Sequence, residues 1–68
     1  MKTIKIFNID NAIDCIWENN LLAEFEEEIA EIPEGSCFKD VIEEEGITLE
    51  QLVDFLNKNS DNEKYEIA

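Results

Sequence analysis

The chain has 68 residues, with eighteen acidic residues against five lysines and neither arginine nor histidine, so its formal net charge is −13. A chain of this length forms one small domain over residues 1–68, and 44% hydrophobic residues are enough for a compact core. We expect no direct binding of nucleic acid, because that affinity comes from lysine and arginine side chains that neutralise phosphates. Anionic membrane surfaces are disfavoured for the same reason, whereas a basic protein remains a suitable partner.

The sequence shows no targeting or metal-binding pattern. No apolar run approaches the roughly 18 residues of a transmembrane helix, and "MKTIKIFNID" lacks the apolar region and cleavage site of a signal peptide. We therefore expect a cytoplasmic protein that does not engage membranes. Cys15 and Cys37 lie among apolar neighbours and are interpreted as reduced thiols, with a single disulfide as the alternative. Without histidine, two thiols are too few for a zinc or iron–sulfur site, so we expect no metal and no cofactor.

The N-terminal segment predicts a strand followed by a helix. "KTIKIF", residues 2–7, mixes β-branched residues with lysine and places Ile4 and Ile6 on one side of a period-two pattern, which is typical of a strand. Asn8 or Asp10 is a suitable N-cap for the helix that follows. The apolar residues of that helix recur at helical spacing at Ile13, Ile16 and Trp17.

The apolar pattern then changes direction. A second stripe has spacings of three, four and three residues, at Leu22, Phe25, Ile29 and Ile32. One interpretation, which we favour, is a break at Asn19–Asn20, where an asparagine caps a second helix over 22–32. The other is one continuous helix with two apolar faces, which would leave Trp17 and Leu21 partly outside the core and available to a dimer or a partner.

The segment after this helix predicts a third, shorter helix. Pro33–Gly35 ends the second helix, and Ser36 is the predicted N-cap of the third. Gly46 is the predicted C-terminal stop. The apolar side of the third helix consists of Phe38, Val41 and Ile42.

The last third of the chain predicts a fourth helix and a second strand. Thr48 and Gln51 form a T-x-x-Q capping box, and Ile47 is positioned for a hydrophobic staple with Leu52. The apolar stripe of this helix is Leu49, Leu52, Val53 and Leu56. "KYEIA", residues 64–68, reads as a strand that can pair with 2–7. The predicted fold is therefore α+β, a short N-terminal strand with three to four helices, and the alternative is a mainly α domain.

The acidic residues concentrate in the helical middle of the chain. Between Asp10 and Asp54 there are fifteen acids and one base, Lys39. In the helix predicted over 22–32, four glutamates fall at i, i+3, i+4 and i+7 and are expected to share one solvated face, on which like charges repel. These are Glu24, Glu27, Glu28 and Glu31. Such a face usually carries interspersed lysines, and this one has none.

The second acidic cluster stands where it lowers helix stability. Glu43, Glu44 and Glu45 fall in the last turn of the third helix, at the negative pole of its macrodipole. Local stability does not explain that placement, so a surface that is negative for a functional reason is the simplest explanation. A secondary set of acids flanks this cluster at Asp40, Glu50 and Asp54.

These patterns lead to a functional hypothesis. Rows of carboxylates on rigid helices resemble the phosphates of a nucleic acid, and a protein with a basic groove would accept them. We therefore expect an inhibitor that mimics nucleic acid and binds a basic nucleic-acid-processing protein, of the kind that phages and mobile elements direct against host nucleases. CRISPR effectors, which would make it an anti-CRISPR, restriction enzymes and DNA-repair enzymes are eligible targets. Trp17, Phe7 or Tyr65 would supply an apolar anchor.

Two other readings of the sequence remain. The protein is a small regulatory adaptor or antitoxin-like partner of one basic protein, or an acidic domain whose charge serves only solubility. An enzyme is not expected, because no histidine or other base accompanies Ser36 or the thiols, and the acids are predicted to be exposed. The EF-hand spacing for calcium is absent as well. Monomer and homodimer are both compatible with the sequence.

Overall fold

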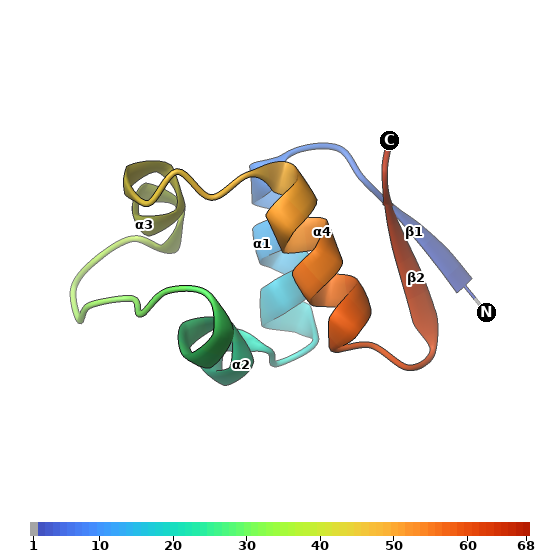
Figure 1. Ribbon diagram of the computed structural model, residues 1–68, viewed down its shortest axis with the longest axis horizontal. Helices are drawn as coiled ribbons and strands as arrows, with labels where there is room; N and C mark the ends of the chain where they lie inside the picture. Colours follow the sequence, from blue (N-terminus) through green and yellow to red (C-terminus); the bar gives the residue numbers. More distant parts are fainter. Residues whose placement is uncertain (1) are drawn as a thin grey trace.

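A computed structural model describes residues 2–68 and contains four helices and two strands. In chain order the elements are β1 (Lys2–Ile6), α1 (Ile9–Glu18), α2 (Leu22–Glu28), α3 (Phe38–Glu44), α4 (Leu49–Lys58) and β2 (Glu63–Ile67). The predicted α+β class is confirmed, including the pairing of the N-terminal strand with a C-terminal one. The molecule measures 36 × 21 × 16 Å. The strands lie at one end of the long axis, α2 and α3 at the other, and α1 and α4 between them (Figure 1).

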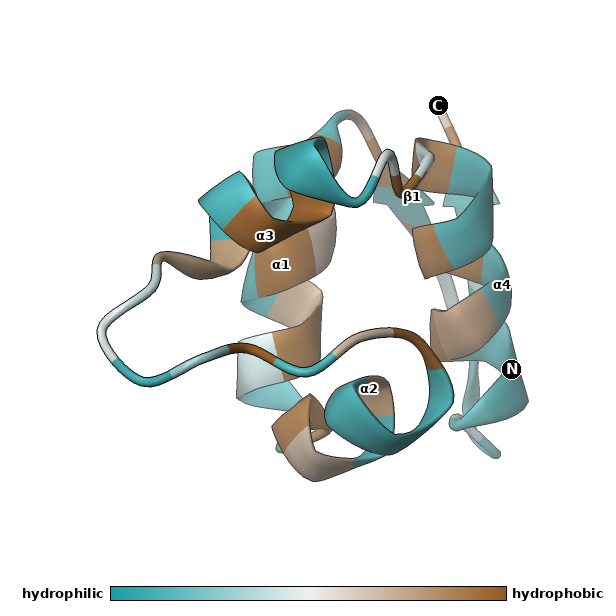
Figure 2. Ribbon diagram, turned by 60° about the vertical axis from the view of Figure 1, so that its left-hand side comes forward, coloured by the Kyte–Doolittle hydropathy of each residue, from teal (hydrophilic) through white to brown (hydrophobic). Residues whose placement is uncertain are grey.

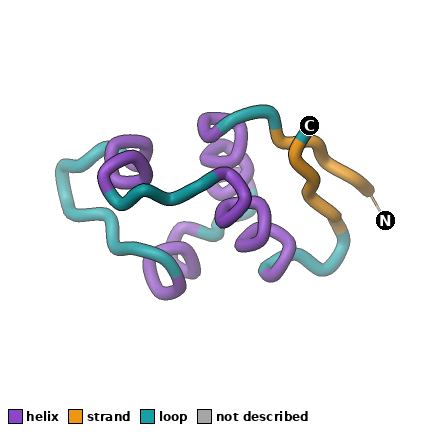
Figure 3. Tube along the Cα trace, turned by 45° about the horizontal axis from the view of Figure 1, so that its top comes forward, coloured by secondary structure: helices purple, strands orange, loops and turns teal. Residues whose placement is uncertain are grey.

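The two strands run parallel and are joined through all four helices. Their register runs from Lys2 opposite Glu63 to Ile6 opposite Ile67. Parallel strands need such a long crossover connection, and the helices provide it (Figure 3). Ile6 and Tyr65 are buried on the side of the sheet that meets the helices, so the sheet closes one end of the core.

A reciprocal pair of asparagines starts α1. The Oδ1 atom of Asn8 accepts a hydrogen bond from the Asn11 N–H at 2.9 Å, and the Oδ1 atom of Asn11 accepts one from the Phe7 N–H at 2.9 Å. Of the two predicted N-caps, Asn8 is therefore the correct one. Asp10 lies inside the first turn of the helix, where a negative charge is favourable.

The predicted break between the first two helices is confirmed. Asn20 has a φ of 59°, in the left-handed region, and the Leu21 N–H donates to the Ile16 carbonyl at 2.9 Å. These features form a Schellman ending of α1, which turns the chain so that both apolar stripes face one core. The expectation that an asparagine caps α2 is wrong, because its N-cap is Leu21, which makes no side-chain capping bond.

Helix α2 ends at Glu28, four residues before the predicted end. The Ile29 and Ala30 N–H groups both donate to the Phe25 carbonyl, so the last turn widens and the chain leaves the helix. The carboxylate of Glu26 then accepts a hydrogen bond from the Ile32 N–H at 3.2 Å. Pro33 has no N–H to continue the helical ladder, and acids without a base crowd the C-terminal end, so an early ending is physically reasonable.

The ends of α3 and α4 match the sequence prediction with one exception. Gly46 has a φ of 66° and follows α3, and its neighbour Ile47 donates to the Ile42 carbonyl at 3.0 Å. Thr48 and Gln51 form the predicted capping box of α4. Ser36 is not the N-cap of α3. The helix begins one residue later, with Cys37 at the N-cap and no side-chain capping bond.

The core lies between α1 and α4 and is closed by α2, α3 and the sheet. The apolar faces of the helices turn toward one another, and the polar faces turn outward (Figure 2). Phe25 packs against Phe38 at 4.8 Å between ring centroids and against Phe55 at 5.8 Å. Both cysteines are free thiols; Cys15 is buried, and Cys37 is exposed.

Candidate functional site

Helix α4 follows the α3 cluster in the chain, and its C-terminal half meets the end of α2. At its N-terminal end, the turn 46–48 places Glu50 close in sequence to the end of α3. Asp54 follows one turn along the exposed side of α4, and Glu28 at the end of α2 meets the C-terminal half of the same helix. We call this arrangement the α4 acidic surface and define it by Glu28, Glu43, Glu44, Glu45, Glu50 and Asp54.

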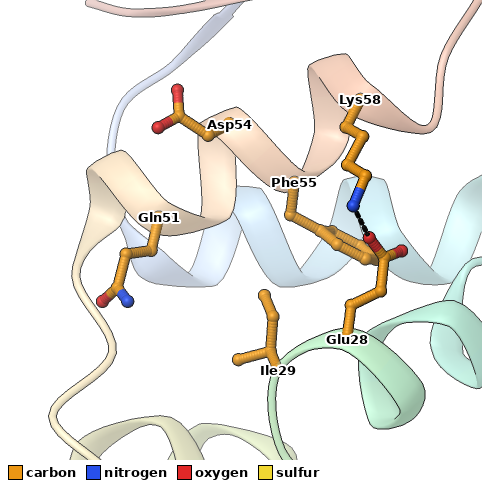
Figure 4. Close-up of a pocket in the computed structure, with 6 residues that line it drawn as sticks. All are labelled: Glu28, Ile29, Gln51, Asp54, Phe55 and Lys58. Carbon is orange, nitrogen blue, oxygen red and sulfur yellow. Dashed lines mark ion pairs between the residues drawn. The ribbon is translucent and has the colours of Figure 1, made fainter.

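A shallow groove separates the end of α2 from α4. Its volume is about 290 Å³, and it is lined by Glu28, Ile29, Gln51, Asp54, Phe55 and Lys58 (Figure 4). Across it, the Lys58 Nζ atom lies 2.6 Å from the Glu28 Oε1 atom, and Asn59 donates a hydrogen bond to Oε2 at 3.1 Å. The hydrogen bonds from Lys58 and Asn59 hold the pKa of Glu28 below its ordinary value. Within residues 2–68, Glu28 is therefore the one member of the surface that already has a cation partner.

The four glutamates predicted to share one face of the second helix do not do so. Glu27 is exposed on α2, but Glu24 is half-buried, and its Oε2 atom is shielded from solvent with no hydrogen-bond partner. Glu31 is exposed in the irregular segment after α2, so it cannot continue a helical row. The expectation that all acids are exposed is also wrong for Glu26, Glu63 and Glu66, which are half-buried.

The acids of α3 lie as predicted. Asp40 is in the first turn, where the helix dipole favours it. Glu43 and Glu44 occupy the last turn and Glu45 is the C-cap, with no basic residue in that turn. All three are exposed. The unfavourable end of this short helix therefore presents a group of carboxylates that nothing in the helix offsets.

Most of the lysines pair with acids outside the predicted site. Lys5 lies 2.7 Å from Glu66, Lys64 lies 3.3 Å from the same carboxylate, and Lys39 lies 3.3 Å from Asp10. Within residues 2–68, each predicted site acid other than Glu28 lacks a lysine within ion-pair distance. These are Glu24, Glu27, Glu31, Asp40, Glu43, Glu44, Glu45, Glu50 and Asp54.

The three aromatic residues predicted as anchors differ in accessibility. Phe7 is 71% exposed and Trp17 is 53% exposed, although the ring of Trp17 also meets Phe38 edge-on at 5.9 Å. Tyr65 is only 2% exposed, and its hydroxyl accepts a hydrogen bond from Asn19 at 3.0 Å, so it cannot serve as an anchor. Tyr65 belongs to the core because it stands on the inner face of β2.

Two exposed acids that the site prediction omitted accompany Trp17. Asp14 precedes it by three residues and Glu18 follows it, so all three lie on the solvent-exposed part of α1. These acids belong to α1, whereas the members of the α4 acidic surface come from α2, α4 and the end of α3. Helical spacing around an exposed tryptophan would have found them, but the sequence did not show that Trp17 is exposed.

The described residues contain no other recognisable site. Across residues 2–68, no three cysteine and carboxylate side chains come together in a way that could hold a metal ion. None of the four helices in this range has the length and apolar character needed to cross a bilayer. Comparisons with protein-family models, curated proteins and solved structures found no match to the chain.

Proposed function

We propose that this protein is a nucleic-acid-mimicking inhibitor of a basic nucleic-acid-processing protein, for example a restriction enzyme or a CRISPR effector. The observation that supports the proposal is the group of exposed carboxylates at the end of α3, Glu43, Glu44 and Glu45. They stand where they destabilise their own helix, and no lysine in residues 2–68 neutralises them. An arrangement that lowers stability is expected to persist only where a partner uses it.

The geometry of α4 supports the same proposal. Glu50 and Asp54 are four residues apart, which corresponds to about 6 Å along a helix. Phosphates on one DNA strand follow one another at about 3.4 Å along the axis, so the two spacings are of the same order. Because the carboxylates are carried by a helix anchored in the core at Leu52, Val53 and Leu56, they form a fixed array rather than a flexible tail.

The partner implied by this array has a groove lined with lysine and arginine. The net charge of −13 would steer such a partner toward the inhibitor and raise the association rate. Binding would therefore weaken as salt rises and would compete with the nucleic acid that the partner normally holds. No direct binding of nucleic acid by the chain itself is part of the proposal.

The test begins with capture of partners from a bacterial lysate on the tagged protein at physiological salt, followed by elution with DNA or RNA. A purified nucleic-acid-binding protein recovered in this way is then titrated in a competition assay with labelled nucleic acid. The wild-type chain is expected to displace the nucleic acid. The triple variant E43Q/E44Q/E45Q is expected to bind about tenfold more weakly, since it loses three charge pairs of about 0.5 kcal/mol each.

The matched control is D14N/E18Q/D61N, which removes the same number of exposed charges outside the α4 acidic surface. The control is expected to bind as tightly as the wild type, apart from a small loss of association rate. Equal weakening of both triple variants would mean that only the net charge matters. A partner that binds without any competition from nucleic acid would refute mimicry.

The exposed Trp17 favours a second candidate function, a regulatory adaptor or antitoxin-like partner of one basic protein. A tryptophan that is 53% exposed and flanked by Asp14 and Glu18 fits a partner with an apolar pocket and a basic rim. Under this alternative, W17A and the D14N/E18Q/D61N variant lose binding, while E43Q/E44Q/E45Q keeps it. The two functions therefore predict opposite orders of affinity for the same two triple variants.

A further inference from the structure

The two edges of the sheet differ in whether their main-chain groups have hydrogen-bond partners. On the outer edge of β2, the side chain of Asn57 takes the place of a neighbouring strand. Its Nδ2 atom donates to the Tyr65 carbonyl at 2.9 Å, and its Oδ1 atom accepts from the Tyr65 N–H at 2.7 Å. Among residues 2–68, no side chain makes a corresponding pair of hydrogen bonds to β1. β1 forms the outermost element at that end of the molecule in Figure 3, and Lys2, Thr3 and Lys5 are exposed.

The hydrogen-bond pattern shows which groups of β1 are free. Ile4 stands opposite Tyr65 in the register, and Tyr65 directs its N–H and C=O toward Asn57. In a parallel pair, the N–H and C=O of Ile4 must then point toward β2, in agreement with the hydrogen bond from Ala68 to the Ile6 carbonyl at 3.0 Å. Because successive residues alternate, Thr3 and Lys5 direct their main-chain groups outward. An exposed edge of this kind is a template for another strand.

The charge distribution points to the identity of that strand. Residues 2–7 and 61–68 carry three lysines and three acids, so the sheet end is electrically balanced. The whole net charge of −13 therefore lies in residues 8–60. A second copy of the chain can approach at the sheet end without meeting this charge. The 36 Å long axis then keeps the two acidic helical parts at opposite ends of the pair.

We propose that β1 pairs with β1 of a second copy, antiparallel and centred on Ile4, to form a four-stranded sheet. In this register, Thr3 of each copy faces Lys5 of the other, and the pair exchanges two main-chain hydrogen bonds on each side of the two-fold axis. Ile4, which is half-buried in one copy, meets Ile4 of the other. No two lysines stand directly opposite each other, because Lys2 faces Ile6 and Lys5 faces Thr3, so the register avoids like-charge repulsion.

The first test is the mass in solution, measured by sedimentation equilibrium over a wide concentration range. The wild-type chain is expected to rise from 7.9 kDa toward twice that value as concentration increases. K5P removes the outward N–H of residue 5 but leaves the hydrogen bonds between β1 and β2 in place, because proline is tolerated on edge strands. It is expected to abolish the rise. K5A is the matched control, because it also loses the ion pair with Glu66 but keeps the N–H. A mass of one chain at all concentrations overturns the proposal, as does a dimer that survives in folded K5P.

A second test does not depend on the folding of K5P. In a C37S background, which removes the exposed native thiol, I4C is expected to form a disulfide-linked dimer under mild oxidation. Residues at a non-hydrogen-bonded antiparallel position have Cα atoms about 4.5 Å apart, which is within the range that a disulfide spans. I67C, exposed on β2, is the control and is expected to cross-link far more slowly. Equal rates for the two variants overturn the pairing through β1. Either result leaves the mimicry proposal unchanged, since the α4 acidic surface lies outside the sheet.

Discussion

Asn57 is the single side chain on which the closed edge of the sheet depends. It projects from the last turn of α4 and binds both main-chain groups of Tyr65, so it connects the helix to β2 as a strand would. The buried ring of Tyr65 then fixes that strand against the core. A polar residue near the end of an amphipathic helix thus determines where the C-terminal strand lies.

Replacing Asn57 with alanine is expected to cost about 2 kcal/mol of unfolding free energy. The substitution leaves the N–H and C=O of Tyr65 without partners, and an unsatisfied part-buried group costs about 1–3 kcal/mol. Urea denaturation followed by the fluorescence of Trp17 measures the change. Asn62 is exposed and makes no side-chain hydrogen bond within residues 2–68, so N62A is the control and is expected to be nearly neutral. A loss as small in N57A as in N62A would contradict the role assigned to Asn57.

The thiol of Cys15 is expected to make the free energy of unfolding depend on pH in the alkaline range. Burial, followed by the charges of Glu18, Asp14 and Glu63, raises the pKa of its thiol above the ordinary value of 9.0. Above pH 9 the unfolded chain releases this proton while the folded chain retains it, so unfolding becomes more favourable as pH rises. Denaturation midpoints at stepped pH should fall above pH 9 in the wild type. The fall should be smaller in C15A but unchanged in C37S, and identical slopes in all three would refute the linkage to Cys15.

At the scale of one element, the acids at the C-terminal end of α3 are expected to lower the free energy of unfolding. E43Q/E44Q/E45Q is expected to raise the unfolding free energy by about 1 kcal/mol, because each acid at the C-terminal end of a helix costs a few tenths of a kcal/mol or more. D40N, in the first turn of the same helix, is the opposing control and is expected to lower stability slightly. Thermal unfolding of the wild type, the triple variant and D40N measures both changes in stability. A triple variant less stable than the wild type would show that these carboxylates have a structural role.

The elements that were predicted correctly are those specified by local chemistry. The capping box of Thr48 and Gln51 and the left-handed Gly46 after α3 depend only on residues within a few positions, so the sequence is enough to place them. The end of α2 depends on the hydrogen bond between Glu26 and the Ile32 N–H, outside any regular pattern, and was misplaced.

Tertiary contacts explain the remaining errors about the site. Lys58 and Glu28 are thirty positions apart in sequence, and their ion pair forms only because α2 meets α4. The burial of Tyr65 likewise depends on the parallel pairing of β2 with β1, whose direction a sequence pattern does not give. The position of the acids on α3 could be read from the sequence, but the groove that brings Glu28 and Asp54 together could not.

At the scale of the whole molecule, charge is separated along the long axis. The sheet end carries balanced charges joined by the ion pairs of Lys5 and Lys64 with Glu66, whereas the helical part carries the net charge of −13. The two ends are therefore suited to different contacts. The helical end can meet a basic partner while the sheet end pairs with a second copy. An inhibitor built in this way would present two acidic surfaces to two copies of its target.

Added salt is expected to stabilise the fold, because like charges within the helical part repel one another at close range. At 0.15 M ionic strength the screening length is about 8 Å, well below the 36 Å long axis, so much of this repulsion is removed. The four ion pairs among residues 2–68 oppose the trend, but ion pairs at the surface contribute little. The urea midpoint should therefore rise from low to physiological sodium chloride, and rise less in E43Q/E44Q/E45Q. A midpoint that falls with salt would mean that the lysine pairs outweigh the repulsion among the acids.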